Sequence, residues 1–372
     1  MRKIIFILAI LFISCKEEKP KLAQNFSTAK IEYELETIVP NTDVPWGMVF
    51  LPDNSILYTE RKGELIHFKN NTKTKIEGLP EIYVRGQGGL LDVELHPNYK
   101  NNGWIYLSFS SDINNKGGGG NTTILRGKIE NNTLVNKEII YKATPNFTNG
   151  THFGSRITFD NDGFLFFSIG DRYNRNTLPQ DITKDAGKIY RLNDDGTIPK
   201  DNPFVNTKNA KKAIYSYGHR NPQGMVLHPN TGKIWTHEHG PQGGDEINII
   251  KAGKNYGWPK ASYGVNYGGS VFTEHKTLPG MENPIHYWVP SIAPSGMEFV
   301  TSNIYPEWKG NLLVGSLKFQ YLNRCIIKNN KVVKEIKMLE GLGRVRSIKQ
   351  SPDGFIYVGI EHKGIVKIIP KK

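Results

Sequence analysis

The chain has 372 residues, and its 48 Lys and Arg against 35 Asp and Glu give a formal net charge of +13. Its 38 Gly and 21 Pro predict many turns, and its 17 Tyr and 17 Phe favour strands over helices. The length suffices for one large all-β domain or two smaller domains. The charge permits nucleic acid, an anionic surface or an anionic small ligand as partner, without choosing among them.

The first residues predict export. Arg2 and Lys3 precede the apolar run 4–13, which is too short to span a bilayer, and Ser14 and Cys15 follow. This order resembles a bacterial lipoprotein signal over residues 1–15. It implies a lipid on Cys15 and an exported lipoprotein on the periplasmic side of a membrane or at the cell surface. The alternative is cleavage near Ser14 and a soluble exported protein.

Residues 16–30 begin with KEEKPK and are predicted to form a flexible tether. With Cys15 lipidated, Cys325 is the only remaining thiol, which excludes an intramolecular disulfide. Stability must then come from packing, from closure of the fold and from any bound metal.

Six segments repeat one pattern, in which a small residue, an alternating apolar strand, a turn and a second strand follow one another. Their ranges are 46–60, 89–110, 154–171, 223–238, 295–317 and 346–360. Each predicts a β-hairpin, and the gaps between them leave room for two more strands. We therefore predict an all-β fold over residues 31–372, a six-bladed β-propeller of four-stranded antiparallel blades. Segment 31–39 would complete the last blade; a β-sandwich with extra hairpins is the alternative.

The repeats also predict which residues share one face. In an antiparallel hairpin, the residue before the first strand and the residue after the second lie at the same end. Blades from all parts of the chain should therefore aim polar groups at one mouth. The residues in these two positions are Trp46, Glu60, Gln87, His152, Asp171, Arg220, Asn221, His239, Pro294, Lys318 and Arg344.

Among these residues His152 is the candidate for taking a proton at neutral pH, although a single histidine before a strand is more often a structural hydrogen-bonding group. Four cations from three blades would converge on a compact polyanion, which Arg binds through paired hydrogen bonds. They are Arg220, Lys318, Arg344 and Arg346. No long basic run with interleaved aromatics occurs, which argues against nucleic acid as partner.

The densest cluster of polar residues lies between Tyr217 and Pro259 and includes the loop HGPQGGDE at 239–246. Its carboxylates and its Gly-Pro backbone offer the hard oxygen donors that Ca²⁺ prefers. The sequence contains neither HExxH nor paired CxxC, which argues against a zinc or iron–sulfur centre. The glycines of GQGG at 86–89 do not lead from a strand into a helix, which argues against a dinucleotide fingerprint.

Several motifs together resemble a known family. They are RGQGGLLDVELHP, THFGSRITFDNDGFLFFSIGDR, GKIYRLNDDGTIPKDNPF, YSYGHRNPQGM, HEHGPQGGDEINII, NYGWP, LLVGSLK and RVRSIKQSPDG, in order over residues 85–354. In these motifs the chain resembles the soluble pyrroloquinoline quinone (PQQ)-dependent glucose and aldose sugar dehydrogenases, also called glucose/sorbosone dehydrogenases. The resemblance implies oxidation of aldoses to lactones, with PQQ and Ca²⁺ as cofactors and a six-bladed propeller as fold.

The resemblance also implies roles for individual residues. His152 would be the general base that takes the proton of the anomeric hydroxyl as hydride passes from C1 to the quinone, and Arg220 would stabilise charge on that oxygen. The other cofactor-binding positions would be Gln87, Asn221, His239, Lys318, Arg344 and Arg346. The carbonyls of Gly240 and Pro241 would ligate the Ca²⁺ at the quinone. Glu246 and Tyr256 would belong to a second, structural calcium site.

Two positions depart from the glucose dehydrogenase branch, since Thr151 replaces Asp and His239 replaces Gln. The chain is thus more similar to the aldose sugar dehydrogenase branch. The sequence does not identify the sugar or the electron acceptor, and it is compatible with a monomer or a dimer. The rival functions are a non-catalytic propeller that binds carbohydrate or a protein partner at the same mouth, and a calcium-dependent lactonase.

Overall fold

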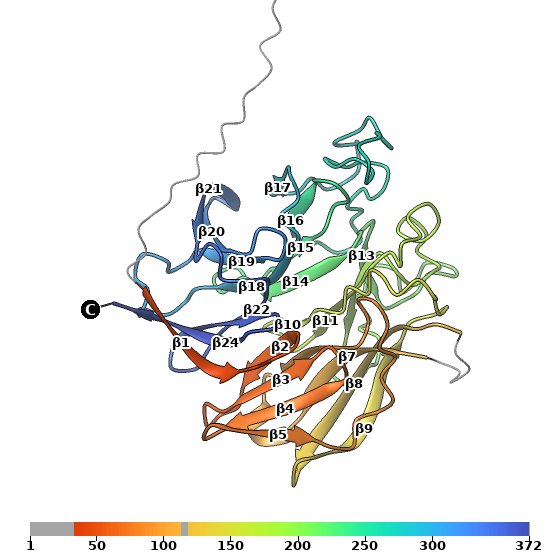
Figure 1. The fold of residues 1–372 in the computed structure, drawn as a ribbon. Coiled ribbons are helices and arrows are strands. Elements are labelled where there is room, and N and C mark those ends of the chain that lie inside the picture. Colours follow the sequence, from red (N-terminus) through yellow and green to blue (C-terminus); the bar gives the residue numbers. More distant parts are fainter. Residues whose placement is uncertain (1–32, 113–117, 372) are drawn as a thin grey trace, which may run out of the picture.

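The computed structural model describes residues 33–112 and 118–371. In these residues the strands form six four-stranded antiparallel sheets, which follow one another around a ring in chain order (Figure 1). This confirms the predicted six-bladed β-propeller. The predicted signal peptide, Cys15 and the predicted tether lie outside the described residues.

Each of the six predicted hairpins forms the two inner strands of one blade. The first five blades contain β2–β5, β6–β9, β10–β13, β14–β17 and β18–β21, and the sixth contains β22–β24 together with β1. In chain order the elements are β1 (Tyr33–Pro40), β2 (Pro45–Phe50), β3 (Ile56–Glu60), β4 (Glu64–Lys69), β5 (Thr72–Ile76), β6 (Leu90–Leu95), α1 (Tyr99–Asn102), β7 (Ile105–Ser111), β8 (Asn121–Glu130), β9 (Thr133–Lys142), β10 (Ile157–Phe159), β11 (Leu165–Ile169), β12 (Lys188–Leu192), β13 (Ile214–Tyr217), β14 (Pro222–Leu227), β15 (Ile234–Glu238), β16 (Asp245–Ile249), β17 (His286–Trp288), β18 (Pro294–Phe299), β19 (Leu312–Ser316), β20 (Leu322–Lys328), β21 (Lys331–Met338), β22 (Val345–Gln350), β23 (Ile356–Ile360) and β24 (Gly364–Pro370).

The ring is closed by pairing the first strand with the last. Strand β1 runs antiparallel to β24, from the pair Tyr33 and Pro370 to the pair Pro40 and Gly364. The N-terminal segment thus completes the last blade, as the sequence predicts. Closure of this kind leaves only short strand edges at the rim of each blade.

Apolar side chains fill the space between neighbouring blades. Val49 and Leu57 of the first blade, for example, share a buried cluster with Leu90 and Leu107 of the second. Near the ring axis the inner strands approach so closely that the repeats use glycine. A Cβ on Gly47 would lie 2.4 Å from Asp92 Oδ1 in the next blade, closer than side chains tolerate.

A buried ion pair connects the first three blades and fixes the entry to the third. Arg156 Nη1 donates to Asp92 Oδ1 at 2.9 Å, and the guanidinium lies 4.1 Å from the centre of the Trp46 ring. The other Asp92 oxygen accepts from the backbone N–H of Ile157, the first residue of β10. The loop that precedes β10 is therefore held firmly at its end.

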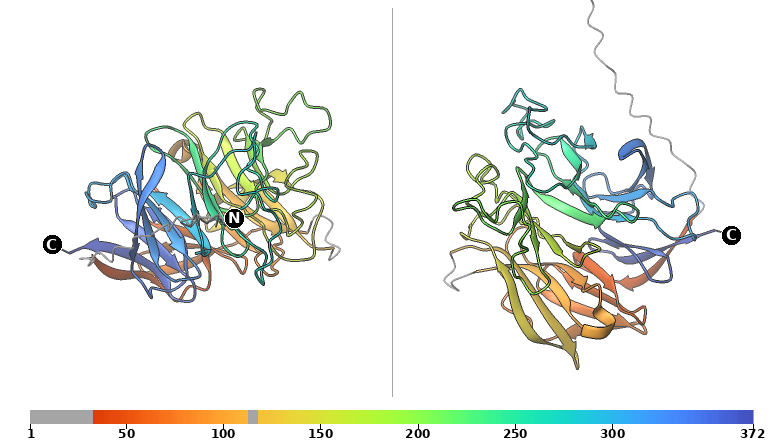
Figure 2. Two further views of the ribbon diagram at one scale, coloured as in Figure 1. Left: turned by 90° about the horizontal axis from the view of Figure 1, so that it is seen from above. Right: turned by 180° about the vertical axis from the view of Figure 1, so that it is seen from behind.

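Long loops of the third and fourth blades extend well beyond their strands (Figure 2).

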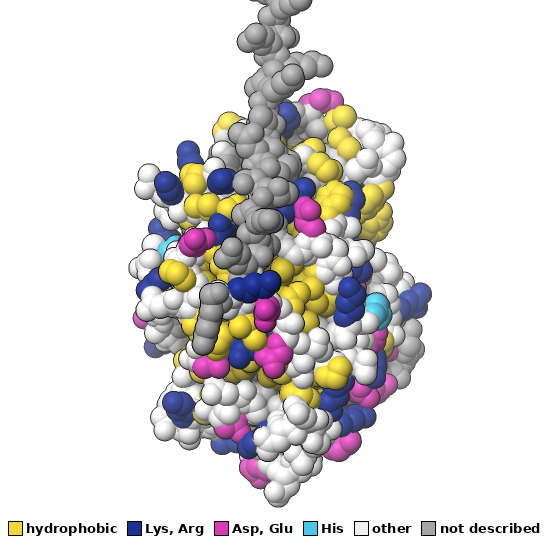
Figure 3. All heavy atoms as spheres, turned by 60° about the vertical axis from the view of Figure 1, so that its left-hand side comes forward, with side chains coloured by type: hydrophobic (Ala, Val, Ile, Leu, Met, Phe, Trp, Pro, Cys, Tyr) yellow, Lys and Arg dark blue, Asp and Glu magenta, His cyan; other side chains and the backbone are white. Residues whose placement is uncertain are grey.

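The face of the molecule drawn in Figure 3 shows apolar side chains near its centre, interspersed with basic and acidic ones. An apolar groove of about 500 Å³ runs along β1 and β24 and is lined by none of the predicted site residues. No helix within the described residues has the length and apolar character needed to cross a membrane.

Candidate active site

The loop before β10 presents His152 to a carboxylate from the same blade. His152 Nδ1 lies 2.6 Å from Oδ1 of Asp171, which follows β11, and its backbone N–H donates to Gln87 Oε1 at 2.8 Å. Because a carboxylate only accepts hydrogen bonds, Nδ1 carries the proton. The other ring nitrogen, Nε2, has no hydrogen-bond partner among the described residues, so it is available to accept a proton.

Asp171 is itself held by several donors. Trp258 Nε1 donates to Oδ2 at 2.8 Å, and the backbone N–H of Tyr173 donates to Oδ1 at 2.8 Å. Burial raises the pKa of Asp171, but the hydrogen bond and charge of His152 and the charge of Arg220 outweigh it and bring that pKa below its usual range. Asp171 is therefore an anchored, ionised carboxylate that orients the imidazole.

The surroundings of the His152 imidazole favour its neutral form. His152 is only 6% exposed, and burial, followed by the positive charge of Arg220, lowers its pKa below 6.5 despite the opposing effect of Asp171. At neutral pH His152 is thus uncharged and able to act as a base.

The fourth blade brings Arg220 to the same place. Its backbone carbonyl accepts from the Asp171 N–H at 2.7 Å, and its Nη1 donates to the carbonyl of His239 at 3.0 Å. Its neighbour Asn221 accepts, through Oδ1, a hydrogen bond from the Gly154 N–H at 3.0 Å. These contacts confirm the predicted placement of the inner-strand ends of the third and fourth blades at one mouth.

A cavity of about 480 Å³ opens above these residues. Its inner part is formed by the imidazole, its carboxylate partner and the guanidinium, and its outer part by two long loops. It is lined by His152, Asp171, Tyr173, Asn174, Arg175, Asn176, Arg220, Pro241, Trp258, Asn266, Tyr267 and Ser270. The volume lies within the range of small-ligand pockets.

The loop 239–246 borders this cavity through Pro241. Asp245 organises the loop, since it accepts hydrogen bonds from the N–H groups of Gly240 (2.8 Å) and Ile292 (2.8 Å). Burial raises the pKa of Asp245 to about 6. A Cβ on Gly240 would lie 2.2 Å from the carbonyl oxygen of Gly243, so the turn requires glycine there.

A second, very small cavity lies beside the first and contains two carboxylates, Glu238 and Glu246. Burial, and then the negative charge of Glu238, raise the pKa of Glu246 well above its usual range. The cavity volume of about 10 Å³ is enough for one ion or one water. Tyr256 also lines it, but its hydroxyl donates to the carbonyl of Ile249 at 2.7 Å and accepts from the N–H of Lys251 at 2.9 Å, so that hydroxyl is already engaged within the protein.

The other predicted cations form a separate group in the fifth and sixth blades. Arg346 is buried and donates to Glu361 Oε1 through Nε (2.8 Å), and Arg344 binds the second oxygen of the same carboxylate. Arg344 Nη1 also donates to the carbonyl of Leu317, which places it beside the exposed Lys318. None of these three cations lines the 480 Å³ cavity.

His239 and Gln87 lie at the border of the site. The Nε2 of His239 faces the carbonyl of Pro294, and burial lowers its pKa well below 6.5. Gln87 is exposed, and it contributes the oxygen that binds the His152 backbone. Both residues position others, and neither lines the 480 Å³ cavity, although His239 lines the small one.

Sequence reasoning did not assign roles to Asp171, Trp258, Tyr173 and Arg175. Asp171 carried a signal, since it occupies a predicted mouth position after a second strand. Trp258 lies in the motif NYGWP, whose side-chain contacts no spacing rule predicts. Tyr173 and Arg175 lie in a loop without periodicity, so no pattern could have found them.

The fold and the cavity together define a six-bladed β-propeller with a buried histidine–carboxylate pair at its mouth. Residues 42–367 match the model of the family described as Glucose / Sorbosone dehydrogenase. The aldose sugar dehydrogenase YliI of Escherichia coli K12 is 39% identical over 347 residues, which cover 91% of this chain and 93% of that protein.

Solved structures agree with the sequence comparison. The apo form of the soluble E. coli aldose sugar dehydrogenase matches with a TM-score of 0.88 and 37% identity over 91% of this chain and 99% of that chain. The PQQ-bound aldose sugar dehydrogenase of Streptomyces coelicolor matches with a TM-score of 0.73 and 25% identity over 91% and 98%. The chain therefore belongs to the glucose/sorbosone dehydrogenase family, and it is an oxidoreductase.

Proposed function

We propose that the protein oxidises aldose sugars at C1 to lactones, with PQQ and Ca²⁺ as cofactors. The observation that carries the proposal is the anchored His152–Asp171 pair, with the free Nε2 of His152 in a cavity that also holds Arg220. Membership in the family, and a relative of 25% identity solved in its PQQ-bound form, support the choice of cofactor.

The residues present fit an anionic cofactor. Lys318, Arg344 and Arg346 carry three positive charges, and Glu361 is the one carboxylate that pairs with them among the described residues. The surplus of positive charge suits a compact molecule with several carboxylates. These three cations would hold PQQ from the side of the fifth and sixth blades.

The residues also fit Ca²⁺. In the described parts of the chain, no group of three or more His, Cys, Asp and Glu side chains is arranged to hold a metal. A cation at the loop 239–246 would therefore depend on the backbone oxygens of Gly240 and Pro241, which are hard donors. The facing carboxylates Glu238 and Glu246 would favour a second cation in the small cavity, since it would relieve their mutual repulsion.

When bound, PQQ would supply the acceptor for the hydride that leaves C1, and Ca²⁺ would make that acceptor more electrophilic. The protein would supply the base. His152 Nε2 would accept the proton of the C1 hydroxyl, and Asp171 would stabilise the imidazolium that forms. Arg220 would donate a hydrogen bond to the same substrate oxygen as its negative charge develops.

The cofactor proposal is tested by titrating the purified protein with PQQ and following absorbance, with Ca²⁺ and with a chelator. We expect saturable binding that depends on Ca²⁺. The loaded protein is then given several aldoses and an artificial electron-accepting dye, whose bleaching reports turnover. Saturable PQQ binding without turnover of any aldose, or no PQQ binding at all, would contradict the proposal.

Loss of a single carboxylate tests the second cation. In Glu246→Gln we expect a lower melting temperature in the presence of Ca²⁺ and a smaller stabilisation by added Ca²⁺ than in the parent protein, because one charged oxygen is lost. An unchanged response of the melting temperature to Ca²⁺ would exclude Glu246 as a ligand.

We also propose that the protein is an exported lipoprotein anchored through Cys15, on the order of the basic, apolar and Ser14-Cys15 segments of the sequence. Metabolic labelling with a fatty-acid analogue should mark the parent protein and leave Cys15→Ser unmarked. Equal partition of both forms into the soluble fraction would favour ordinary cleavage near Ser14.

A further inference from the structure

The outer part of the cavity is built from polar side chains of two loops, one between β11 and β12 and the other between β16 and β17. The exposed rings of Tyr173 (63%) and Tyr267 (66%) border it. The remaining polar groups are Asn174, Arg175, Asn176, Asn266 and Ser270. Amides, hydroxyls and exposed rings of this kind suit a polyhydroxylated ligand.

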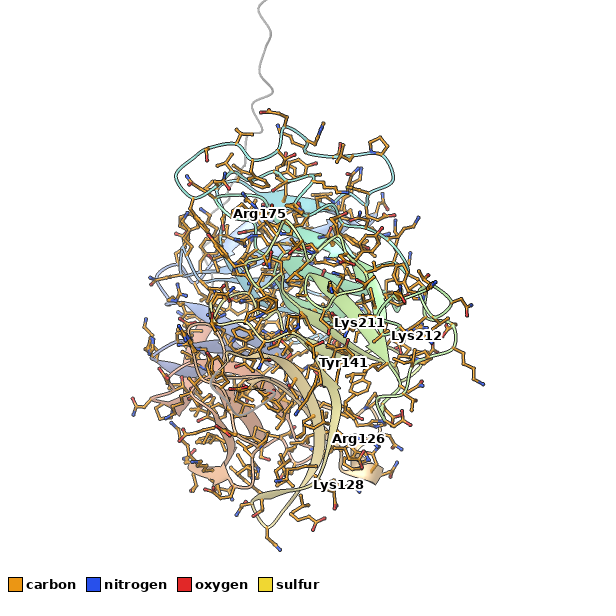
Figure 4. The ribbon with its side chains drawn as sticks, turned by 90° about the vertical axis from the view of Figure 1, so that its right-hand side faces the viewer. Arg126, Lys128, Tyr141, Arg175, Lys211 and Lys212 are labelled. Carbon is orange, nitrogen blue, oxygen red and sulfur yellow. The ribbon has the colours of Figure 1, made fainter. Side chains whose placement is uncertain are left out.

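Arg175 is the charged group of this outer part. Its Nη1 donates to Asn266 Oδ1 at 2.8 Å, so the guanidinium bridges the two loops. Its central carbon also lies 4.5 Å from the centre of the Phe272 ring. Figure 4 shows Arg175 among the loops rather than on a strand. A guanidinium that is already held by a hydrogen bond and by contact with an aromatic ring loses little further conformational entropy when it binds a ligand.

A continuous chain of contacts connects this guanidinium to the catalytic pair. Phe272 packs edge-on against Trp258, with ring centres 5.3 Å apart. Trp258 in turn donates to Asp171, the partner of His152. Arg175 and the proposed base thus occupy two positions on the wall of one cavity, and this chain of contacts connects them.

The charges that line the cavity leave Arg175 without a counterion. Asp171 is the one carboxylate among the lining residues, and both of its oxygens are occupied by the imidazole, the indole and a backbone N–H. Across the described residues, Arg175 forms no ion pair with Asp or Glu. A neutral sugar offers such a group only hydroxyls, whereas a carboxylate offers two oxygens that match the guanidinium fork.

We propose that Arg175 binds a carboxylate of the substrate, so that the preferred substrates are acidic aldoses, namely hexuronic acids. This inference rests on the proposed function. In a hexuronic acid the carboxylate is C6, attached to C5, and only the ring oxygen separates C5 from C1, so the carboxylate can meet Arg175 on the wall of the cavity in which C1 faces His152. At C1 the hydroxyl proton passes to His152, and the hydride passes to the quinone of the proposed cofactor. The product is the lactone, and the C6 carboxylate is unchanged.

The first test compares matched pairs of sugars that differ only at C6. In the loaded protein, kcat/KM for D-glucuronate and D-galacturonate should exceed kcat/KM for D-glucose and D-galactose by about 10-fold or more, the range of a hydrogen bond to a charged group. The advantage should shrink at high salt. Turnover of the neutral sugars with no preference for the acids would overturn this inference and leave the proposed function standing. No turnover of any sugar would instead contradict the proposed function.

The second test assigns the preference to Arg175. In Arg175→Gln the ratio of kcat/KM on glucuronate to that on glucose should fall by about 10- to 100-fold, and Arg175→Lys should retain part of it. Lys212→Gln, which removes an exposed positive charge that does not line the cavity, is the matched control and should keep the parent ratio. Equal losses on both sugars in Arg175→Gln would show that the residue only holds the loops.

Binding provides a readout that does not depend on turnover. Isothermal titration of the apoprotein with glucuronate should give heat that saturates, and Arg175→Gln should weaken that binding by about 10-fold or more. If glucuronate binds the parent and Arg175→Gln equally well, the inference is wrong.

Discussion

Among the described residues, two buried histidines lie within hydrogen-bond distance of a carboxylate through Nδ1, and only the imidazole of His152 lines the 480 Å³ cavity. His152 lies 2.6 Å from Asp171, and His219 Nδ1 lies 2.9 Å from Glu238 Oε1. In the second pair the other ring nitrogen is 2.9 Å from the hydroxyl of Ser216, and the imidazole is 0% exposed. A serine, a histidine and a carboxylate connected by hydrogen bonds are therefore not, by themselves, evidence of a catalytic site. What distinguishes the pairs is whether Nε2 is free and can reach a ligand.

The largest expected effect comes from removing the proposed base. In His152→Ala we expect turnover of aldoses to fall by about 10²- to 10⁴-fold, the usual contribution of a general base. The melting temperature should fall only modestly, because Trp258 and the backbone N–H of Tyr173 still donate to the buried Asp171 after the imidazole is lost. Dye-linked kinetics and thermal unfolding measure the two quantities. Unchanged turnover would remove the functional distinction between the two pairs.

Removing the charge of the partner should have the next largest effect. Asp171→Asn keeps the shape of the side chain but no longer stabilises the imidazolium, so turnover should fall by about 10- to 10³-fold. Saturable PQQ binding should remain, which separates this effect from loss of the cofactor site. If turnover survives intact, Asp171 is only a structural partner of Trp258.

The buried pair should respond in the opposite way. In His219→Ala the carboxylate of Glu238 loses a donor and Tyr256 loses the ring on which it stacks, with centres 4.5 Å apart. We expect the free energy of unfolding to fall by about 1–3 kcal/mol, with less effect on turnover per folded molecule than in His152→Ala. Denaturant unfolding measures the first quantity. A variant that is as stable as the parent but inactive would show that the buried pair takes part in the chemistry.

The smallest effect concerns the titration of the apoprotein. Burial, followed by the charge of Arg220, lowers the pKa of His152, so its midpoint in a histidine NMR titration should lie below 6.5. The unfolded chain then binds this proton at a higher pH than the folded chain does. Stability from this group is therefore fully present above pH 6.5 and is lost as the pH falls through the folded pKa. A midpoint at or above 6.5 would mean that Asp171 outweighs burial.

The repeat pattern predicted the fold correctly because alternating strands and Gly-Asp-Asn turns are local signals. It located all six inner hairpins and the closing strand β1, although it missed the short helix α1 within the second repeat. It also placed Asp171 at the mouth, since strand parity fixes the end of a blade at which a residue lies. Parity does not fix side-chain distances, and so the bond between His152 and Asp171 was not predicted.

Loops account for what the sequence could not predict. The contact of Arg175 with Asn266 joins residues 91 positions apart in two segments without periodicity. Local patterns carry no information about such contacts. The position of Lys318, Arg344 and Arg346 outside the main cavity likewise depends on how Glu361 holds two of them. The sequence predicted that these cations share a face. The ion pairs with Glu361 hold Arg344 and Arg346 together, and no pattern in the sequence predicts those pairs.

The pairing of β1 with β24 also sets an orientation. Strand β23 ends at the mouth, and β24 begins there at Gly364. Because Pro40 pairs with Gly364, the last residue of β1 also lies at the mouth. Strand β1 therefore begins, at Tyr33, at the opposite end of the blade. A chain tethered by a lipid before Tyr33 would thus enter the propeller from its underside. The loops that line the cavity would then lie at the end of the propeller away from the point at which the proposed anchor enters.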